Sequence, residues 1–103
     1  MGRFVTVAQL DELPDGAGVE RTVEGRVFAL FRTGDAVYAL DGLCLHAGGP
    51  LGQGQLQGCI VTCPWHGWQY DVATGQHCLN DRLKQPTYPV RIEAGAVQVE
   101  LPE

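Results

Sequence analysis

Two closely spaced apolar segments constrain the fold of this chain more than any other feature. Residues 26–32 and 36–40 are rich in valine, leucine, phenylalanine and tyrosine, and only Thr33-Gly34-Asp35 separates them. Two such segments joined by a short glycine-containing turn are typical of a β-hairpin. Because each segment has apolar side chains on both of its faces, we expect both strands to be central and buried.

The remaining pattern predicts an all-β domain of short antiparallel strands. Glycine accounts for 14 of the 103 residues, about twice its usual frequency, which favours turns and strands over helices. Further strands are predicted at 4–8, 19–24, 59–62, 69–72, 90–93 and 96–101, with one helical turn within 8–14 and irregular loops at 44–58 and 80–89. We therefore expect a small sandwich or barrel.

The charge of the chain argues against nucleic acids and anionic membrane surfaces as partners. The chain has 7 Lys and Arg against 12 Asp and Glu, a net charge of −5, without any cluster of basic residues. Nucleic acids and anionic membrane surfaces both require such clusters, so we expect neither as a partner.

No apolar run approaches the roughly 20 residues of a transmembrane helix, and the first residues lack the apolar region of a signal peptide. We therefore expect a cytoplasmic protein with reduced thiols.

Two short segments contain residues that bind metals. Cys44 and His46 stand in the first segment, Cys63 and His66 stand in the second, and the 16 residues of 47–62 separate them. Glycine and proline flank both segments and allow sharp backbone turns. Two loops of this kind can converge on one inorganic centre.

The order of these ligands distinguishes between metals. Two cysteines and two histidines could bind one zinc ion, but zinc sites usually group two cysteines first and two histidines afterwards. Here each segment supplies one residue of each type, which suits a centre of two metals that both loops can reach. This ligand set is that of a [2Fe–2S] centre in which two histidines replace two cysteines on one iron.

On these residues the chain resembles the Rieske proteins over nearly all of its length. The matching motifs are Cys44-x-His46-x-Gly48-x-x-Leu51, Cys63-Pro64-Trp65-His66-Gly67-Trp68, Gln69-Tyr70-Asp71, Thr74-Gly75 and the Pro86 loop that leads into Tyr88-Pro89-Val90. The resemblance implies one [2Fe–2S] cluster per chain, bound by Cys44, His46, Cys63 and His66. It also implies a Rieske-like sandwich with a basal part at about 1–42 and 79–103 and a two-loop cluster-binding part at about 43–78.

Within this family, the chain is most similar to small Rieske-type ferredoxins. The Rieske proteins of cytochrome bc complexes have a disulfide between the two loops, but the matching positions here are Gly49 and Trp65. Those proteins also have a membrane helix, and the large oxygenase subunits continue into a catalytic domain. The resemblance therefore implies an electron carrier, not an enzyme, that passes single electrons from a flavin-dependent reductase to a terminal oxygenase. Such a carrier needs no permanent oligomer, so we expect a monomer.

The resemblance also assigns roles to residues around the cluster. Trp68 stands where high-potential family members have a serine, whereas Tyr70 matches their tyrosine, so we expect a potential near the low end of the Rieske range. Partners are expected to dock at an exposed tip formed by His46 and His66. The candidate residues around the cluster and at this tip are Leu45, Gly48, Trp65, Gly67, Trp68, Tyr70 and Pro86.

Two alternatives remain open from the sequence. The chain could be the small Rieske subunit of a nitrite reductase, or a zinc-stabilised binding module without a redox role. Cys59 and Cys78 fall in predicted strands, where we expect buried thiols without a function. His77 is expected on a strand at the surface.

Overall fold

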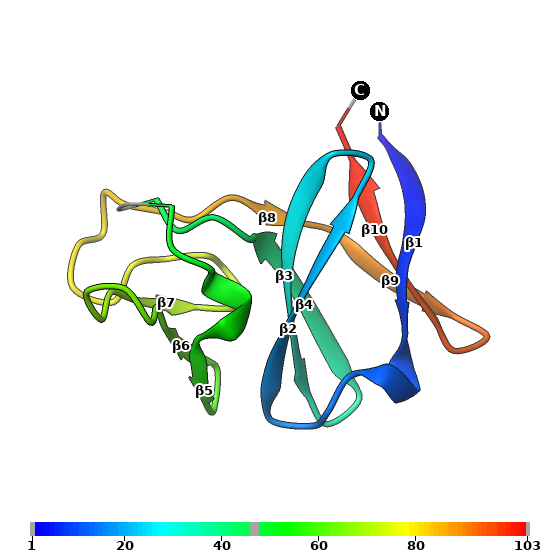
Figure 1. Cartoon of the computed structure of the whole chain (residues 1–103), viewed down its shortest axis with the longest axis horizontal. Helices are drawn as coiled ribbons and strands as arrows, with labels where there is room; N and C mark the ends of the chain where they lie inside the picture. The colour runs from blue at the N-terminus through cyan, green and yellow to red at the C-terminus, as the bar shows by residue number, and fades with distance from the viewer. Residues whose placement is uncertain (1, 46–47, 103) are drawn as a thin grey trace.

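A computed structural model describes residues 2–45 and 48–102, and these residues form an all-β structure, as predicted (Figure 1). The strands are β1 (Arg3–Gln9), β2 (Ala17–Val23), β3 (Arg26–Thr33), β4 (Ala36–Asp41), β5 (Gln55–Gln57), β6 (Ile60–Thr62), β7 (Gln69–Asp71), β8 (Thr87–Tyr88), β9 (Val90–Glu93) and β10 (Ala96–Leu101). Short 3₁₀ turns occur at η1 (Leu10–Glu12), where a helical turn was predicted, and at η2 (Leu51–Gln53). No helix in the described part of the chain is long and apolar enough to cross a membrane.

The strands form three antiparallel sheets with a four-stranded sheet between the other two. Its strand order is β2-β3-β4-β8. The sheet β1-β10-β9 lies on one side of it and the small sheet β5-β6-β7 lies on the other (Figure 1). Two apolar cores therefore form, one on each side of the central sheet.

Strand β3 contributes to both cores because its side chains alternate between the two faces of the sheet. Phe28 and Leu30 belong to the core shared with β1 and β10, which we call the basal core. Ala29 and Phe31 belong to the core shared with β6 and β7, which we call the site core. All four side chains are completely buried, which confirms that this hairpin strand is central.

The basal core closes between β3, β4, β1 and β10. Val97, Val99 and Leu101 point inward from β10 as the alternation predicts. In β1 the register with β10 shifts between Thr6 and Ala8. This bulge adds one residue to β1, so that the consecutive residues Val7 and Ala8 are both buried in the same core.

The site core contains two of the four candidate ligands. Its buried members are Ala29, Phe31, Leu40, Cys44, Leu51, Val61, Cys63, Tyr70 and Val72. The small sheet is too short to have a core of its own, so it is held to the central sheet through these residues. The two cysteines are therefore part of the packing that joins the small sheet to the rest of the molecule.

Two segments that we expected to be irregular contain short elements. The segment 44–58 includes η2 and β5, and the segment 80–89 includes β8. Elements of two or three residues are too short to show a periodic pattern. They form because neighbouring strands pair with them, as β8 pairs with β4 through Thr87 and Leu40.

A substitution at Gly75 tests how closely the segment after β7 packs against the segment before β8. It has φ +80°, and a Cβ there would lie 2.1 Å from the carbonyl oxygen of Gln85. We expect Gly75→Ala to lower the free energy of unfolding by about 2–4 kcal/mol, because it adds a backbone clash to the unfavourable φ. Denaturant titration measures this loss.

The matched control is Gly16, which has φ +78° but no atom within 4 Å of an added Cβ. Gly16→Ala should cost only the conformational term, about 1 kcal/mol. Equal losses in the two variants would contradict the close approach at Gly75.

Candidate metal centre

The first candidate loop follows β4 and closes on itself around Cys44. The N–H of Cys44 donates to the carbonyl of Gly49 over 2.9 Å, and the N–H of Gly48 donates to the carbonyl of Cys44 over 2.8 Å. Gly48 has φ +73°, a conformation that glycine adopts without strain. His46 lies outside the described residues, so its assignment as a ligand stays a prediction.

The second candidate loop is a tight turn between β6 and β7. The N–H of Cys63 donates to the carbonyl of Trp68 over 2.8 Å. Within this turn His66 and Gly67 have φ +67° and +73°, and such a value is uncommon for a histidine. The turn buries Cys63 and leaves Trp65 and His66 exposed. One face of the loop therefore presents a sulfur to the interior, and the other presents an imidazole to solvent.

The two loops meet at their cysteines. Cys44 and Cys63 are 3% and 1% exposed and belong to the same core. A Cβ on Gly49 would lie 2.9 Å from the sulfur of Cys63 and 3.0 Å from the ring of Trp65. Gly49 and Trp65, which stand at the positions of the bc-type disulfide, pack directly against each other.

Tyr70 reaches this pair of cysteines from β7. It is completely buried, and its hydroxyl oxygen lies 3.2 Å from the Sγ of Cys44. Burial raises the pKa of Tyr70 well above its usual range, and the neighbouring sulfur of Cys44 raises it further. The phenol is therefore protonated at neutral pH and can donate a hydrogen bond to the sulfur of Cys44.

The chemistry of the two thiols suits a metal. Burial raises the pKa of Cys63, and the neighbouring Cys44 raises it further, while the backbone N–H of Trp65 opposes the shift. A buried thiol such as Cys63 remains protonated unless a cation compensates the thiolate charge. Metal binding supplies that cation and releases the protons. The described residues contain no group of three or more potential ligands, and the proposed set of four needs His46, which lies outside them.

His77 is a buried neighbour of the site that sequence reasoning placed wrongly at the surface. It is only 8% exposed and lies edge-on to the rings of Trp68 and Tyr70, with ring centroids 4.8 and 5.3 Å away. Its Nδ1 accepts the N–H of Leu79 over 3.0 Å. The isolated bridge between Tyr70 and His77 turns the side chain inward, and no pattern in the sequence indicates this pairing.

The expectation for the other two cysteines was also wrong. Cys59 and Cys78 are free and exposed. Cys59 belongs to the turn between β5 and β6, not to the strand itself. Cys78 directly follows the buried His77, so its side chain points to the opposite side. Both thiols therefore lie outside the site core.

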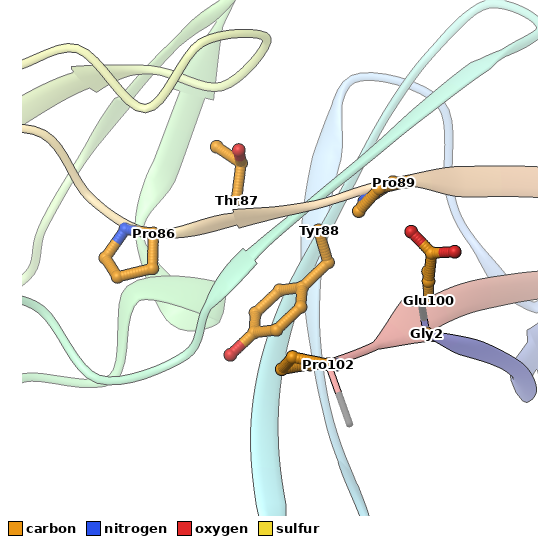
Figure 2. A pocket seen from close by; sticks show the side chains of 7 residues that line it. All are labelled: Gly2, Pro86, Thr87, Tyr88, Pro89, Glu100 and Pro102. Atoms are coloured by element: carbon orange, nitrogen blue, oxygen red, sulfur yellow. The ribbon is translucent and has the colours of Figure 1, made fainter.

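A pocket lined by the β8 segment contains none of the candidate ligands. Figure 2 shows it between that segment and the two ends of the described chain, with Tyr88 directed toward Pro102. Its lining residues are Gly2, Pro86, Thr87, Tyr88, Pro89, Glu100 and Pro102. None of them is a cysteine or histidine, so the pocket adds no ligand to the site.

Comparison with known proteins agrees with this arrangement. The model of the Rieske [2Fe-2S] domain matches residues 3–92. The ferredoxin component of the naphthalene 1,2-dioxygenase system from Pseudomonas aeruginosa is 35% identical over 100 residues, which cover 96% of each chain. The ferredoxin of carbazole 1,9a-dioxygenase from Nocardioides aromaticivorans IC177 has 33% identity and a TM-score of 0.86, covering 93% of this chain and 95% of that one.

A further solved structure contains two components together. It is a complex of reduced oxygenase and oxidized ferredoxin in carbazole 1,9a-dioxygenase, and the matched chain has 26% identity and a TM-score of 0.84. The match covers 94% of this chain and 92% of that one. The chain described here belongs to the Rieske [2Fe–2S] family. Its cofactor is one Rieske-type [2Fe–2S] cluster.

The hydrogen bond from Tyr70 gives a testable effect on the cluster. A donor to a ligand sulfur stabilises the more negative, reduced state. We expect Tyr70→Phe to keep the cluster and to lower its reduction potential by on the order of 50 mV, measured by redox titration. Tyr88→Phe is the control, because that hydroxyl faces Arg26 at 3.4 Å in the basal part. Equal potentials in the two variants would contradict the role of Tyr70.

Proposed function

We propose that the chain is a one-electron carrier that accepts electrons from a flavin-dependent reductase and passes them to the terminal oxygenase of a ring-hydroxylating dioxygenase system. The ferredoxin components among its relatives support this role, and the complex of oxygenase and ferredoxin in carbazole 1,9a-dioxygenase supports the acceptor. The observation that carries the proposal is the pair of buried cysteine sulfurs on two loops, one of which also presents an exposed histidine.

Four residues of this chain would hold the cluster. Cys44 and Cys63 would bind the buried iron, and His46 and His66 would bind the outer iron. When bound, the cluster takes up and releases a single electron. We assign these loops to a cluster-binding part at about 43–78, with a basal part at about 1–42 and 79–103. The basal core supports this division, because all of its buried members lie within 1–42 and 79–103.

The surface around the outer histidines would be the docking surface. Trp65 and Leu45 are 49% and 46% exposed, and Pro86 is exposed beside the first loop. An exposed ligand edge among apolar side chains gives an electron a short route into a docked partner. A small surface of this kind fits a transient interface. We therefore propose a monomer that binds the reductase and the oxygenase one after the other. The free thiols fit a cytoplasmic location.

The two loops of this docking surface are nearly free of charge. Asp71 is the only charged residue between positions 43 and 80, so all 7 basic residues and the other acidic residues lie elsewhere in the sequence. The apolar side chains, and not ion pairs, would therefore supply most of the contact. The partner's patch should be uncharged for the same reason.

Iron analysis and EPR spectroscopy test the assignment of the centre. The dithionite-reduced protein should show a Rieske-type signal and contain two irons per chain. Cys44→Ala and Cys63→Ala should abolish both, because each removes a ligand. Cys59→Ala and Cys78→Ala are the controls and should keep both, since these thiols are exposed and outside the site. A colourless protein with one zinc ion would contradict the proposal and favour a binding module.

The lack of charge on the two loops predicts weak dependence on salt. We expect the rate of electron transfer to the terminal oxygenase of a naphthalene 1,2-dioxygenase system to change less than about twofold between roughly 20 and 500 mM salt. Stopped-flow kinetics measure this rate. Leu45→Lys should make the rate depend on salt by adding a charge at the contact. A tenfold decrease in the unmodified protein would contradict docking at this surface.

A further inference from the structure

We infer that Gln85 is a positioning residue that fixes the conformation of the first cluster loop around Cys44. This inference rests on the proposed function, because it takes Cys44 and His46 as ligands. Gln85 precedes β8 in a segment that the sequence analysis predicted as an irregular loop. Polar residues in such loops are usually exposed, yet Gln85 is completely buried.

The side-chain amide of Gln85 uses both of its donors and its acceptor on the segment around Cys44. Its Nε2 donates to the carbonyls of Asp41 and Leu43, each over 2.8 Å. Its Oε1 accepts the N–H of Leu45 over 3.0 Å. The bonds to Leu43 and Leu45 lie on either side of Cys44 in the sequence. They therefore hold the backbone immediately before and immediately after the ligand.

The backbone at Gln85 and Pro86 is also held by hydrogen bonds. Its N–H donates to the carbonyl of Gly75 over 2.7 Å, and the carbonyl of the next residue, Pro86, accepts the N–H of Asp41 over 2.9 Å. The amide is therefore anchored between the segment after β7 and the end of β4. In Figure 1 the segment before β8 runs beside the segment that leaves β4. Because both its backbone and its side chain are hydrogen-bonded, Gln85 holds the loop backbone on either side of Cys44 in place.

The position of Gln85 beside the first loop determines which part of the backbone its hydrogen bonds fix. Leu45 stands between Cys44 and His46 in the sequence, so the bond to its N–H fixes the backbone directly after Cys44. An apolar side chain of equal length would leave two carbonyls and one N–H without a partner. Buried polar groups without partners are costly, so the loop would rearrange to hydrate them. The backbone geometry at Cys44 would then change.

Gln85→Met tests the inference in the cluster-loaded protein, because methionine has a similar length but forms none of these bonds. We expect iron release to a chelator to be about tenfold faster. We also expect shifted EPR g-values and a changed reduction potential. A residue that only stabilised the fold would leave the EPR g-values of the remaining folded protein unchanged.

Gln76→Met is the matched control. The Nε2 of Gln76 also donates to two backbone carbonyls, those of Asn80 and Leu83, each over 3.2 Å. These bonds are in the same 80–86 segment but do not reach the cysteine loop. Gln76→Met should therefore lower thermal stability without moving the g-values or speeding iron release beyond about twofold.

The outcomes separate this inference from the proposed function. If the unmodified protein has no Rieske-type EPR signal, the proposed function fails. If it has the signal and Gln85→Met matches Gln76→Met in g-values, potential and iron release, the positioning role is overturned. Gln85→Glu is the second variant, for use if Gln85→Met does not fold. It keeps a side-chain oxygen that can accept the N–H of Leu45. Its g-values should also shift, since an oxygen replaces the donor to Asp41 and Leu43, and unchanged g-values would equally overturn the role.

Discussion

The structure depends on one strand that is buried on both faces. Side chains on β3 alternate between the two apolar cores, with Phe28 and Leu30 in the basal core and Ala29 and Phe31 in the site core. Neither outer sheet covers enough apolar surface to fold alone. The small sheet β5-β6-β7 therefore forms only against the central sheet. Everything that positions the metal centre follows from this arrangement, because both cysteine loops extend from elements of the site core.

Placing the cysteines inside a core links metal binding to folding. Cys44 and Cys63 are packed with Leu51, Val61 and Tyr70, and burial raises the pKa of the Cys63 thiol. A metal that compensates the thiolate charge thus acts on the same residues that join the small sheet to the central one. Hydrogen bonds from outside the loops, from the Tyr70 hydroxyl and the Gln85 amide, then refine the position of Cys44. The exposed residues of the loops remain available for contact with partners.

Local features of the sequence predicted much of the fold and of the candidate site. The hairpin of β3 and β4 and the inward face of β10 were predictable because their period-2 patterns extend over several residues. The convergence of Cys44 and Cys63 in one core was predictable from their place in two short turning loops, whereas the full set of four ligands stays a prediction. His77 and Cys59 were placed wrongly, since a one-residue bridge and a two-residue turn decide which way those side chains point. Gln85 was missed because a glutamine in a predicted loop gives no signal of burial.

The sequence by itself determined the chemistry of this protein, namely an all-β chain with two cysteine-histidine loops and almost no charge between positions 43 and 80. These properties depend on residue types and on local spacing, which need no tertiary contact to be read. Only the tertiary structure decided that Gly49 touches Cys63, that Tyr70 reaches Cys44 and that Gln85 clamps the loop around it. These contacts join residues 14 to 44 positions apart in the chain. Such contacts arise from the packing of the site core as a whole, so no local pattern encodes them.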